Sequence, residues 1–151
     1  MINKEIFLQQ LKYLIEDDLY PITSLSNMSA LINQHFDNIN WAGVYLTDEH
    51  NNLYLGPFQG KTACTYIENG KGVCGTSLKE NRTIRVENVH EFKGHIACDS
   101  ASNSEIVIPI HVHDKIYGVL DIDSPILNRF SEEDKDILTQ AVHILEEKLN
   151  K

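Results

Sequence analysis

Residues 105–123 read EIVIPIHVHDKIYGVLDID, and their pattern is the strongest indication of fold class in the chain. Residues 105–112 and 116–123 are dominated by β-branched and other apolar side chains, which favour strands. The sequence His113-Asp114-Lys115 between them is typical of a tight turn. The stretch therefore predicts two antiparallel strands joined in a hairpin.

Side-chain alternation divides the second of these strands between two faces. Successive residues of a strand point to opposite sides of a sheet, so Asp121 and Asp123 are predicted to share one face. Glu105 begins the first strand, out of phase with the isoleucines that follow, and we expect it on the same side. The full division of the second strand sets Ile116, Gly118, Leu120 and Ile122 against Tyr117, Val119, Asp121 and Asp123.

A third strand is predicted at residues 41–46, which read WAGVYL. Its alternation places Trp41, Gly43 and Tyr45 on one face. Gly43 has no side chain, so we expect space beside it for something to lie against the sheet. Aromatic residues are common in sheets, so core packing is as good an explanation for the presence of Trp41 and Tyr45 as contact with a ligand.

The central part of the chain is expected to contain long loops. Residues 48–52 predict a turn that leads into a return strand. The Gly- and Thr-rich sequence from Gly56 is expected to form a loop as far as a short helix at residues 73–80. Residues 83–86 predict another strand, and residues 90–104 predict a long loop. Long loops in compact domains are usually functional.

Both ends of the chain have helical patterns. Apolar residues recur at helical spacing in residues 3–18 and 24–37, and Pro21 is predicted to break the first helix. Ser131-Glu-Glu-Asp opens a final helix as an acidic capping box. This order predicts one α+β domain over residues 1–151, with an antiparallel sheet that carries the N- and C-terminal helices on one face. A loop-covered pocket is expected on the other face.

Composition limits the class of partner. The chain of 151 residues is 42% hydrophobic, enough for one sizeable core, and has a formal charge of −9 with a pI near 5.1. A net acidic surface repels nucleic acid and anionic membranes, so neither is expected as a partner. The first residues are charged where a signal peptide needs an apolar core, and no apolar run suits a spanning helix. We therefore expect a cytoplasmic protein.

Three cysteines, Cys64, Cys74 and Cys98, are the only thiols of the chain. An odd number does not fit a fully paired secreted framework, which leaves free, metal-bound or catalytic thiols. A zinc site could combine all three with His95, which stands three residues before Cys98. Because the spacings are wide and no Cys-x-x-Cys pair is present, redox chemistry is the preferred hypothesis and no metal is expected.

Thiols, acids and aromatics are expected to meet at one end of the sheet. The strand pattern predicts an acidic floor from Asp121, Asp123 and Glu105, and an aromatic wall from Trp41 and Tyr45. Such a pocket suits a small cationic or zwitterionic ligand, because its ammonium group would meet the acids. The alternative is that the aspartates are solvated strand-end acids and that the cysteines are inert. Convergence of the three residue types favours a functional site.

Five stretches form a recognisable set: WAGVYL (41–46), GKGVCGTS (70–77), HIACDSASNSEIVIPI (95–110), GVLDIDSP (118–125) and FSEED (130–134). Together they resemble the free methionine-(R)-sulfoxide reductases, which are single GAF-domain enzymes. The resemblance covers nearly the whole chain. The three cysteines with the DIDSP sequence are more specific than the GAF pattern itself.

The resemblance implies a role for each candidate residue. Cys98 would be the nucleophile, Cys64 the resolving thiol, and Cys74 an auxiliary thiol that can also form a disulfide. The substrate would be free methionine-(R)-sulfoxide, with the aromatic residues beside its methyl thioether. The substrate-binding residues implied are Glu105, Asp121, Asp123, Trp41 and Tyr45.

The chemistry implied is an oxidation and reduction of cysteine. The Cys98 thiolate attacks the sulfoxide sulfur, a protonated acid helps the oxygen leave, and methionine departs with Cys98 as a sulfenic acid. Cys64 condenses with this group to a disulfide, which thioredoxin would reduce. Crowded acids raise one another's pKa, so one could stay protonated, but their negative charge disfavours the Cys98 thiolate. No cofactor is needed, and a homodimer is expected.

A second class of function stays open, because many GAF domains bind cyclic nucleotides or other small regulators as sensors. The fold alone does not decide between a sensor and an enzyme. In a non-catalytic sensor module, ligand binding would survive the loss of the cysteines. In an enzyme, turnover would not.

Overall fold

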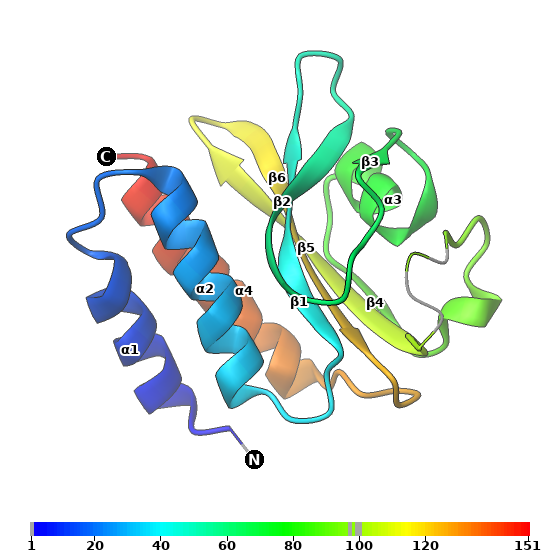
Figure 1. Ribbon diagram of the computed structural model, residues 1–151, viewed down its shortest axis with the longest axis horizontal. Helices are drawn as coiled ribbons and strands as arrows, with labels where there is room; N and C mark the ends of the chain where they lie inside the picture. The colour runs from blue at the N-terminus through cyan, green and yellow to red at the C-terminus, as the bar shows by residue number, and fades with distance from the viewer. Residues whose placement is uncertain (1, 97, 99–100) are drawn as a thin grey trace.

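The structure is a computed structural model that describes residues 2–96, 98 and 101–151. Helices, strands and one short 3-10 helix follow one another along this part of the chain (Figure 1). Their bounds are α1 (Lys4–Ile15), α2 (Pro21–His35), β1 (Trp41–Thr47), β2 (Leu53–Gly60), β3 (Tyr66–Ile67), α3 (Gly72–Glu80), β4 (Ile84–Val86), η1 (Val89–Glu91), β5 (Ser104–Val112), β6 (Lys115–Ser124) and α4 (Glu132–Leu149).

The strands form one antiparallel sheet in the order β3-β2-β1-β6-β5-β4. The hairpin predicted from residues 105–123 is confirmed as β5 and β6, and the strand predicted at residues 41–46 is confirmed as β1. β1 pairs with β6, although the two strands are far apart in the sequence. The predicted α+β class is confirmed, and this pairing places the aromatic strand beside the acidic one.

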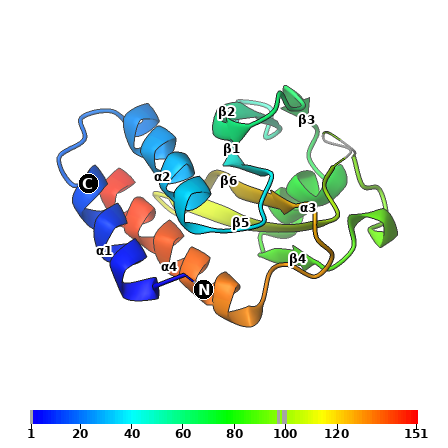
Figure 2. The same ribbon diagram turned by 60° about the horizontal axis from the view of Figure 1, so that its bottom comes forward.

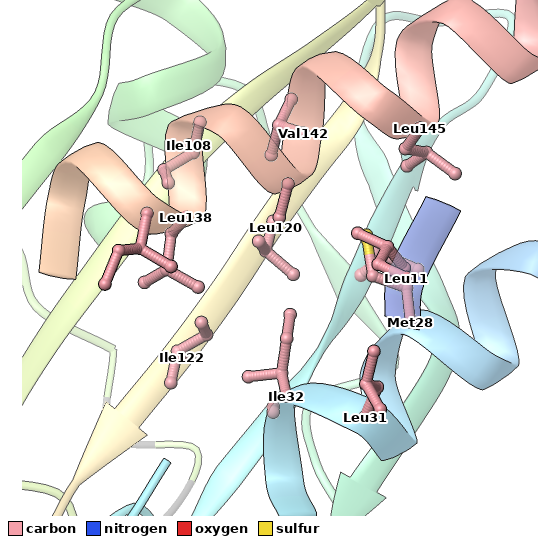
Figure 3. Packing of buried hydrophobic residues seen from close by; sticks show 14 of the residues in the cluster. Leu11, Met28, Leu31, Ile32, Ile108, Leu120, Ile122, Leu138, Val142 and Leu145 are labelled. Carbon is pink, nitrogen blue, oxygen red and sulfur yellow. The ribbon is translucent and has the colours of Figure 1, made fainter. Parts of the chain in front are cut away.

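Helices α1, α2 and α4 lie together on one face of the sheet (Figures 1 and 2). Apolar side chains of the sheet pack against their apolar stripes, and Figure 3 shows Ile108, Leu120 and Ile122 among Leu138 and Val142 of α4. Burial of one such side chain contributes about 1.5–3 kcal/mol. The larger apolar cluster of the protein is therefore on this face, as predicted for the N- and C-terminal helices.

Helix α3 and the connecting segments cover the other face (Figure 1). A second apolar cluster joins Val73 and Leu78 of α3 to Val107 and Val119 of the sheet. The prediction of a continuous loop from Gly56 to α3 was wrong. In the structure β2 pairs with β1 up to its last residue, and the short strand β3 pairs with β2. Ladder pairing is a tertiary effect that outweighs the local Gly and Thr content.

A β-bulge near the hairpin turn changes the predicted alternation of β6. The register with β5 shifts by one residue between Ile110 and His111, which leaves Tyr117 as the extra residue. Tyr117 therefore packs on the side of α1, α2 and α4, whereas Ile116 packs on the side of α3. The prediction for these two side chains was wrong. Beyond the bulge, the predicted alternation is confirmed to the end of the strand.

Side-chain caps begin two of the helices, α1 and α4. Asn3 accepts a hydrogen bond from the Ile6 N–H at 3.1 Å, and Ser131 with Asp134 forms the predicted capping box of α4. The sequence predicts that Pro21 breaks the first helix. In the structure Pro21 instead begins α2, where its missing N–H removes no helical hydrogen bond. Among the described residues, no helix is both long enough and apolar enough to cross a membrane.

Candidate active site

Strand register brings three acids together on the α3 side of the sheet. Glu105 of β5 pairs with Asp123 of β6, and Asp123 pairs with Trp41 of β1. Asp121 lies two residues earlier on β6, on the same face and opposite Gly43. Glu105 and Asp121 are 6% and 5% exposed, and Asp123 is half-buried. The acids thus share the face that alternation predicts, and two of them are not solvated.

The environment of these acids favours their protonated forms. Burial, and after it the charges of Asp121 and Asp123, raises the pKa of Glu105 well above its ordinary range. Burial also raises the pKa of Asp121, although hydrogen bonds with Glu105 and Cys74 act in the opposite direction. Within the described residues, Glu105 and Asp121 form no salt bridge, and the buried Oδ1 of Asp121 has no hydrogen-bond partner. Such a cluster can retain a proton near neutral pH and can bind a cationic group.

Trp41 and Tyr45 form a wall of the pocket above these acids. Their ring centroids are 5.8 Å apart in a stacked arrangement, and Trp41 also stacks on Phe58 of β2 at 5.2 Å. The Trp41 indole N–H donates a hydrogen bond to the Lys61 carbonyl at 3.1 Å, and the Tyr45 hydroxyl donates one to the Cys64 carbonyl at 2.9 Å. Both aromatic residues therefore line the pocket and bind the chain that carries Cys64.

The space beside Gly43 is filled by the protein itself. A Cβ atom at this position would collide with Phe58 and would lie 2.8 Å from Cη2 of Trp41. The expectation that Gly43 leaves room for a ligand against the sheet was therefore wrong. Its missing side chain instead lets Phe58 and Trp41 approach the strand closely, which fixes the aromatic wall.

Cys64 and Cys98 form a disulfide, with Cα atoms 5.4 Å apart. Cys64 lies between β2 and β3, and Cys98 lies in the loop before β5 and lines the pocket. Both residues are half-buried, so the disulfide is not enclosed in the core. The fold thus brings two thiols that are 34 residues apart in the sequence within bonding distance.

Cys74 is a free thiol in the first turn of α3 and is 4% exposed. Its Sγ lies 4.0 Å from Oε2 of Glu105. Burial, and after it the charges of Asp121 and Glu105, raises the pKa of Cys74 well above its ordinary range. The thiolate is the reactive form of cysteine, so Cys74 is poorly suited to attack at neutral pH.

A metal ion would find one group of donors with suitable spacing among the described residues. Cys74, Glu105 and Asp121 each offer one ligand atom, and the three atoms lie within 4.8 Å of one another. Their raised pKa values disfavour the deprotonated forms that metal binding requires. The zinc set considered from the sequence is disrupted, because Cys64 and Cys98 are bonded to each other.

The pocket is a small cavity of about 40 Å³ that opens to solvent. His95 and Ile96, from the predicted loop, close it beside the start of α3. A Cβ atom added to Gly72 would lie only 3.2 Å from Cγ1 of Ile96. Gly72 has a φ of +63° and no side chain, so it permits Ile96 to pack here. Burial, and after it His90, lowers the pKa of His95, which favours a neutral imidazole at the pocket edge.

Two features of the pocket are not predicted by the sequence. Gly72 and Val73 line it beside the predicted Cys74 at the start of α3, where the first backbone N–H groups have no partner within the helix. Lys71 and Ser102 also line it, and the Ser102 hydroxyl accepts a hydrogen bond from Asn40 Nδ2 at 3.1 Å. The glycines around Lys71 are a local signal for the helix start. Nothing in the local sequence marks Ser102.

Comparison with known proteins agrees with this geometry. The GAF domain family matches residues 22–149. Two relatives are named free methionine-R-sulfoxide reductase: the Escherichia coli protein is 53% identical over 85% of this chain and 77% of its own length, and the Saccharomyces cerevisiae protein is 43% identical over 95% and 86%. The structure of fRMsr of Staphylococcus aureus in complex with substrate is 54% identical, covers 99% of this chain and 97% of its own, and gives a TM-score of 0.94. The chain therefore belongs to the free methionine-R-sulfoxide reductase family of GAF-domain proteins.

Proposed function

We propose that this chain reduces free L-methionine-(R)-sulfoxide to L-methionine with its cysteine thiols. The observation that carries the proposal is the Cys64–Cys98 disulfide beside a pocket of buried acids and stacked aromatic rings. Two relatives carry the name of this activity, and one solved structure is of the Staphylococcus aureus fRMsr in complex with substrate. Both findings support the same reaction for this chain.

The substrate is proposed to bind through both ends of the amino acid. Its ammonium group would meet Glu105, Asp121 and Asp123, where the unpartnered Asp121 oxygen offers an acceptor. Its carboxylate would meet the backbone N–H groups at the start of α3, which have no partner within the helix. The methyl thioether would lie against the stacked aromatic rings. Because the pocket binds both the ammonium and the carboxylate of the free amino acid, a methionine sulfoxide residue within a peptide chain should be excluded.

The first half-reaction uses Cys98 as the nucleophile. Its thiolate attacks the sulfoxide sulfur while a protonated acid donates to the departing oxygen, and in net terms the oxygen moves to the Cys98 sulfur. The substrate sulfur is reduced by two electrons, and Cys98 is oxidised by two electrons to a sulfenic acid. Glu105 is the best-supported donor because burial and two neighbouring acids raise its pKa. A protonated Glu105 also repels the Cys98 thiolate less than an ionised one would.

The second half-reaction restores the thiols. The Cys64 thiol attacks the Cys98 sulfenic acid, which forms the disulfide and releases water. Cys64 is preferred to Cys74 as the resolving thiol because it bonds to Cys98 here, whereas Cys74 is buried with a raised pKa. An external dithiol then reduces the half-buried disulfide, and thioredoxin, with a potential of about −270 mV, is a suitable donor.

The deciding experiment couples NADPH oxidation to the reaction through thioredoxin and thioredoxin reductase. We expect turnover with the separated (R)-epimer of free methionine sulfoxide, and little with the (S)-epimer or with N-acetylated methionine sulfoxide. Comparable rates on free and N-acetylated substrate would contradict the proposed binding mode. Saturable binding without turnover, unchanged in variants that lack the cysteines, would instead assign the chain to the ligand-binding sensors.

A further inference from the structure

The segment that carries Cys64 lies outside the ladder of the sheet. Residues 61–65 connect the end of β2 to β3 and belong to no strand or helix. Near its end, the Thr65 carbonyl accepts a hydrogen bond from the Leu55 N–H at 3.1 Å. Two side chains of β1 hold the rest: Trp41 donates to the Lys61 carbonyl at 3.1 Å, and Tyr45 donates to the Cys64 carbonyl at 2.9 Å.

These two donors are buried and packed against other aromatic rings. Trp41 and Tyr45 are each 2% exposed, and the Trp41 ring stacks with the rings of both Tyr45 and Phe58. They project from β1, a strand with partners on both sides, β2 and β6. Burial raises the pKa of Tyr45, so its hydroxyl stays protonated and remains a donor. Side-chain hydrogen bonds from an internal strand of the sheet therefore hold the part of the segment that carries Cys64.

We infer that Tyr45 is a positioning residue for the resolving thiol: its hydrogen bond to the Cys64 carbonyl, with that of Trp41 to Lys61, holds Cys64 within reach of Cys98. The inference rests on the proposed function for its role in catalysis. The step concerned is attack of the Cys64 thiol on the Cys98 sulfenic acid, in which a sulfur–sulfur bond forms and water leaves. Tyr45 takes no part in these bonds and acts only through the position of the Cys64 backbone.

Geometry makes this positioning effective. A disulfide requires Cα atoms about 4.4–6.8 Å apart, and the observed separation is 5.4 Å. A chain free to move by a few ångströms would satisfy this condition for only part of the time. Loss of a single hydrogen bond of this kind should therefore lower the effective concentration of one thiol at the other by about three- to tenfold.

The experiment replaces Tyr45 with phenylalanine, which keeps the ring and removes only the donor. Wild-type protein and Tyr45→Phe are equilibrated with mixtures of reduced and oxidised glutathione in the absence of methionine sulfoxide. The Cys64–Cys98 disulfide is then measured by alkylation and mass spectrometry. Tyr66→Phe is the matched control, since Tyr66 lies exposed on β3 and the substitution removes a tyrosine hydroxyl that donates to Asp48 at 2.7 Å.

We expect the equilibrium constant for disulfide formation to fall by about three- to tenfold in Tyr45→Phe and to stay at the wild-type value in Tyr66→Phe. An unchanged constant in Tyr45→Phe, or an equal fall in the control, would overturn the inference. Because no sulfoxide is present, the result holds whether or not the chain is a reductase. Circular dichroism and thermal melting identify any general loss of structure.

A kinetic measurement then places the effect on the catalytic step. After one equivalent of substrate, the Cys98 sulfenic acid is trapped with dimedone at increasing times. The trapped fraction, normalised to methionine released, should persist about three- to tenfold longer in Tyr45→Phe than in wild-type protein. Equal persistence would overturn the catalytic role. Absence of methionine release from wild-type protein would refute the proposed function, and the glutathione equilibrium would still test the positioning.

Discussion

Replacement of Glu105 by glutamine should stabilise the protein at neutral pH while it lowers activity. Glutamine has nearly the shape of glutamic acid and cannot ionise. Burial and the neighbouring acids raise the pKa of Glu105 in the folded protein, whereas the unfolded chain has an ordinary pKa of about 4.3. The folded state therefore holds a proton that the unfolded state releases. The stability that this proton provides is present below the unfolded pKa and is lost as the pH rises through the folded pKa.

The magnitude follows from the linkage between proton binding and folding. While the pH lies between the two pKa values, each pH unit lowers the free energy of unfolding of wild-type protein, relative to Glu105→Gln, by about 1.4 kcal/mol. For a domain of this length, that corresponds to about 3–6 °C in Tm per pH unit. Glu105 is only 6% exposed, so solvent screening removes little of the effect.

The assay is thermal unfolding of both proteins between pH 5 and pH 8. Glu87→Gln is the control, because Glu87 is exposed directly after β4 and the substitution is chemically the same. The difference in Tm between Glu105→Gln and wild-type protein should grow with pH, and the control should stay parallel to wild-type protein. The kcat/KM of Glu105→Gln should fall at least about tenfold, or about 1.4 kcal/mol. Parallel curves for all three proteins would refute the argument that a buried acid costs stability.

Three further predictions concern the thiols and the aspartates. Cys98→Ser should abolish turnover, because a hydroxyl is a poor nucleophile toward sulfur at neutral pH. Its circular dichroism spectrum should match that of wild-type protein. Substantial remaining activity would exclude Cys98 as the nucleophile. Cys64→Ser should release about one methionine per chain and accumulate a sulfenic acid, but thioredoxin-dependent cycling at the wild-type rate would assign resolution to another group. Asp121→Asn and Asp123→Asn should each lower kcat/KM at least about tenfold without an equal loss of Tm, and wild-type kinetics in both would mean that these acids do not bind substrate.

The fold could be predicted where burial imposes a regular period on the sequence. The strands within residues 41–46 and 105–123 have one face against a helical layer, so the alternation of their buried side chains can be recognised from the sequence alone. The short strand β3 could not be predicted, because it exists only through its ladder with β2. The bulge at Tyr117 could not be predicted either, because it depends on how β5 and β6 pair and not on the sequence of either strand alone.

The site could be predicted from the sequence to a similar extent. Alternation groups Asp121, Asp123 and Glu105 correctly, because these residues lie in the part of the hairpin where the register is regular, away from the bulge. It could not show that Phe58, from a neighbouring strand, fills the space beside Gly43. The contacts made by residues 61–65 also depend on tertiary structure, because side chains of β1 and not local sequence fix that segment.

One strand connects the stability of the fold to the chemistry of the pocket. In β6, Leu120 and Ile122 belong to the core beneath the helices, and Asp121 and Asp123 alternate with them to line the pocket. A slip of one residue would move both aspartates into the apolar core and both apolar side chains into the pocket. Burial of unpaired carboxyl groups in an apolar core is strongly unfavourable, so the apolar core itself selects the register that assembles the acids. The acids can therefore tolerate a destabilising position in the pocket, because the alternating residues of the same strand stabilise the arrangement that holds them there.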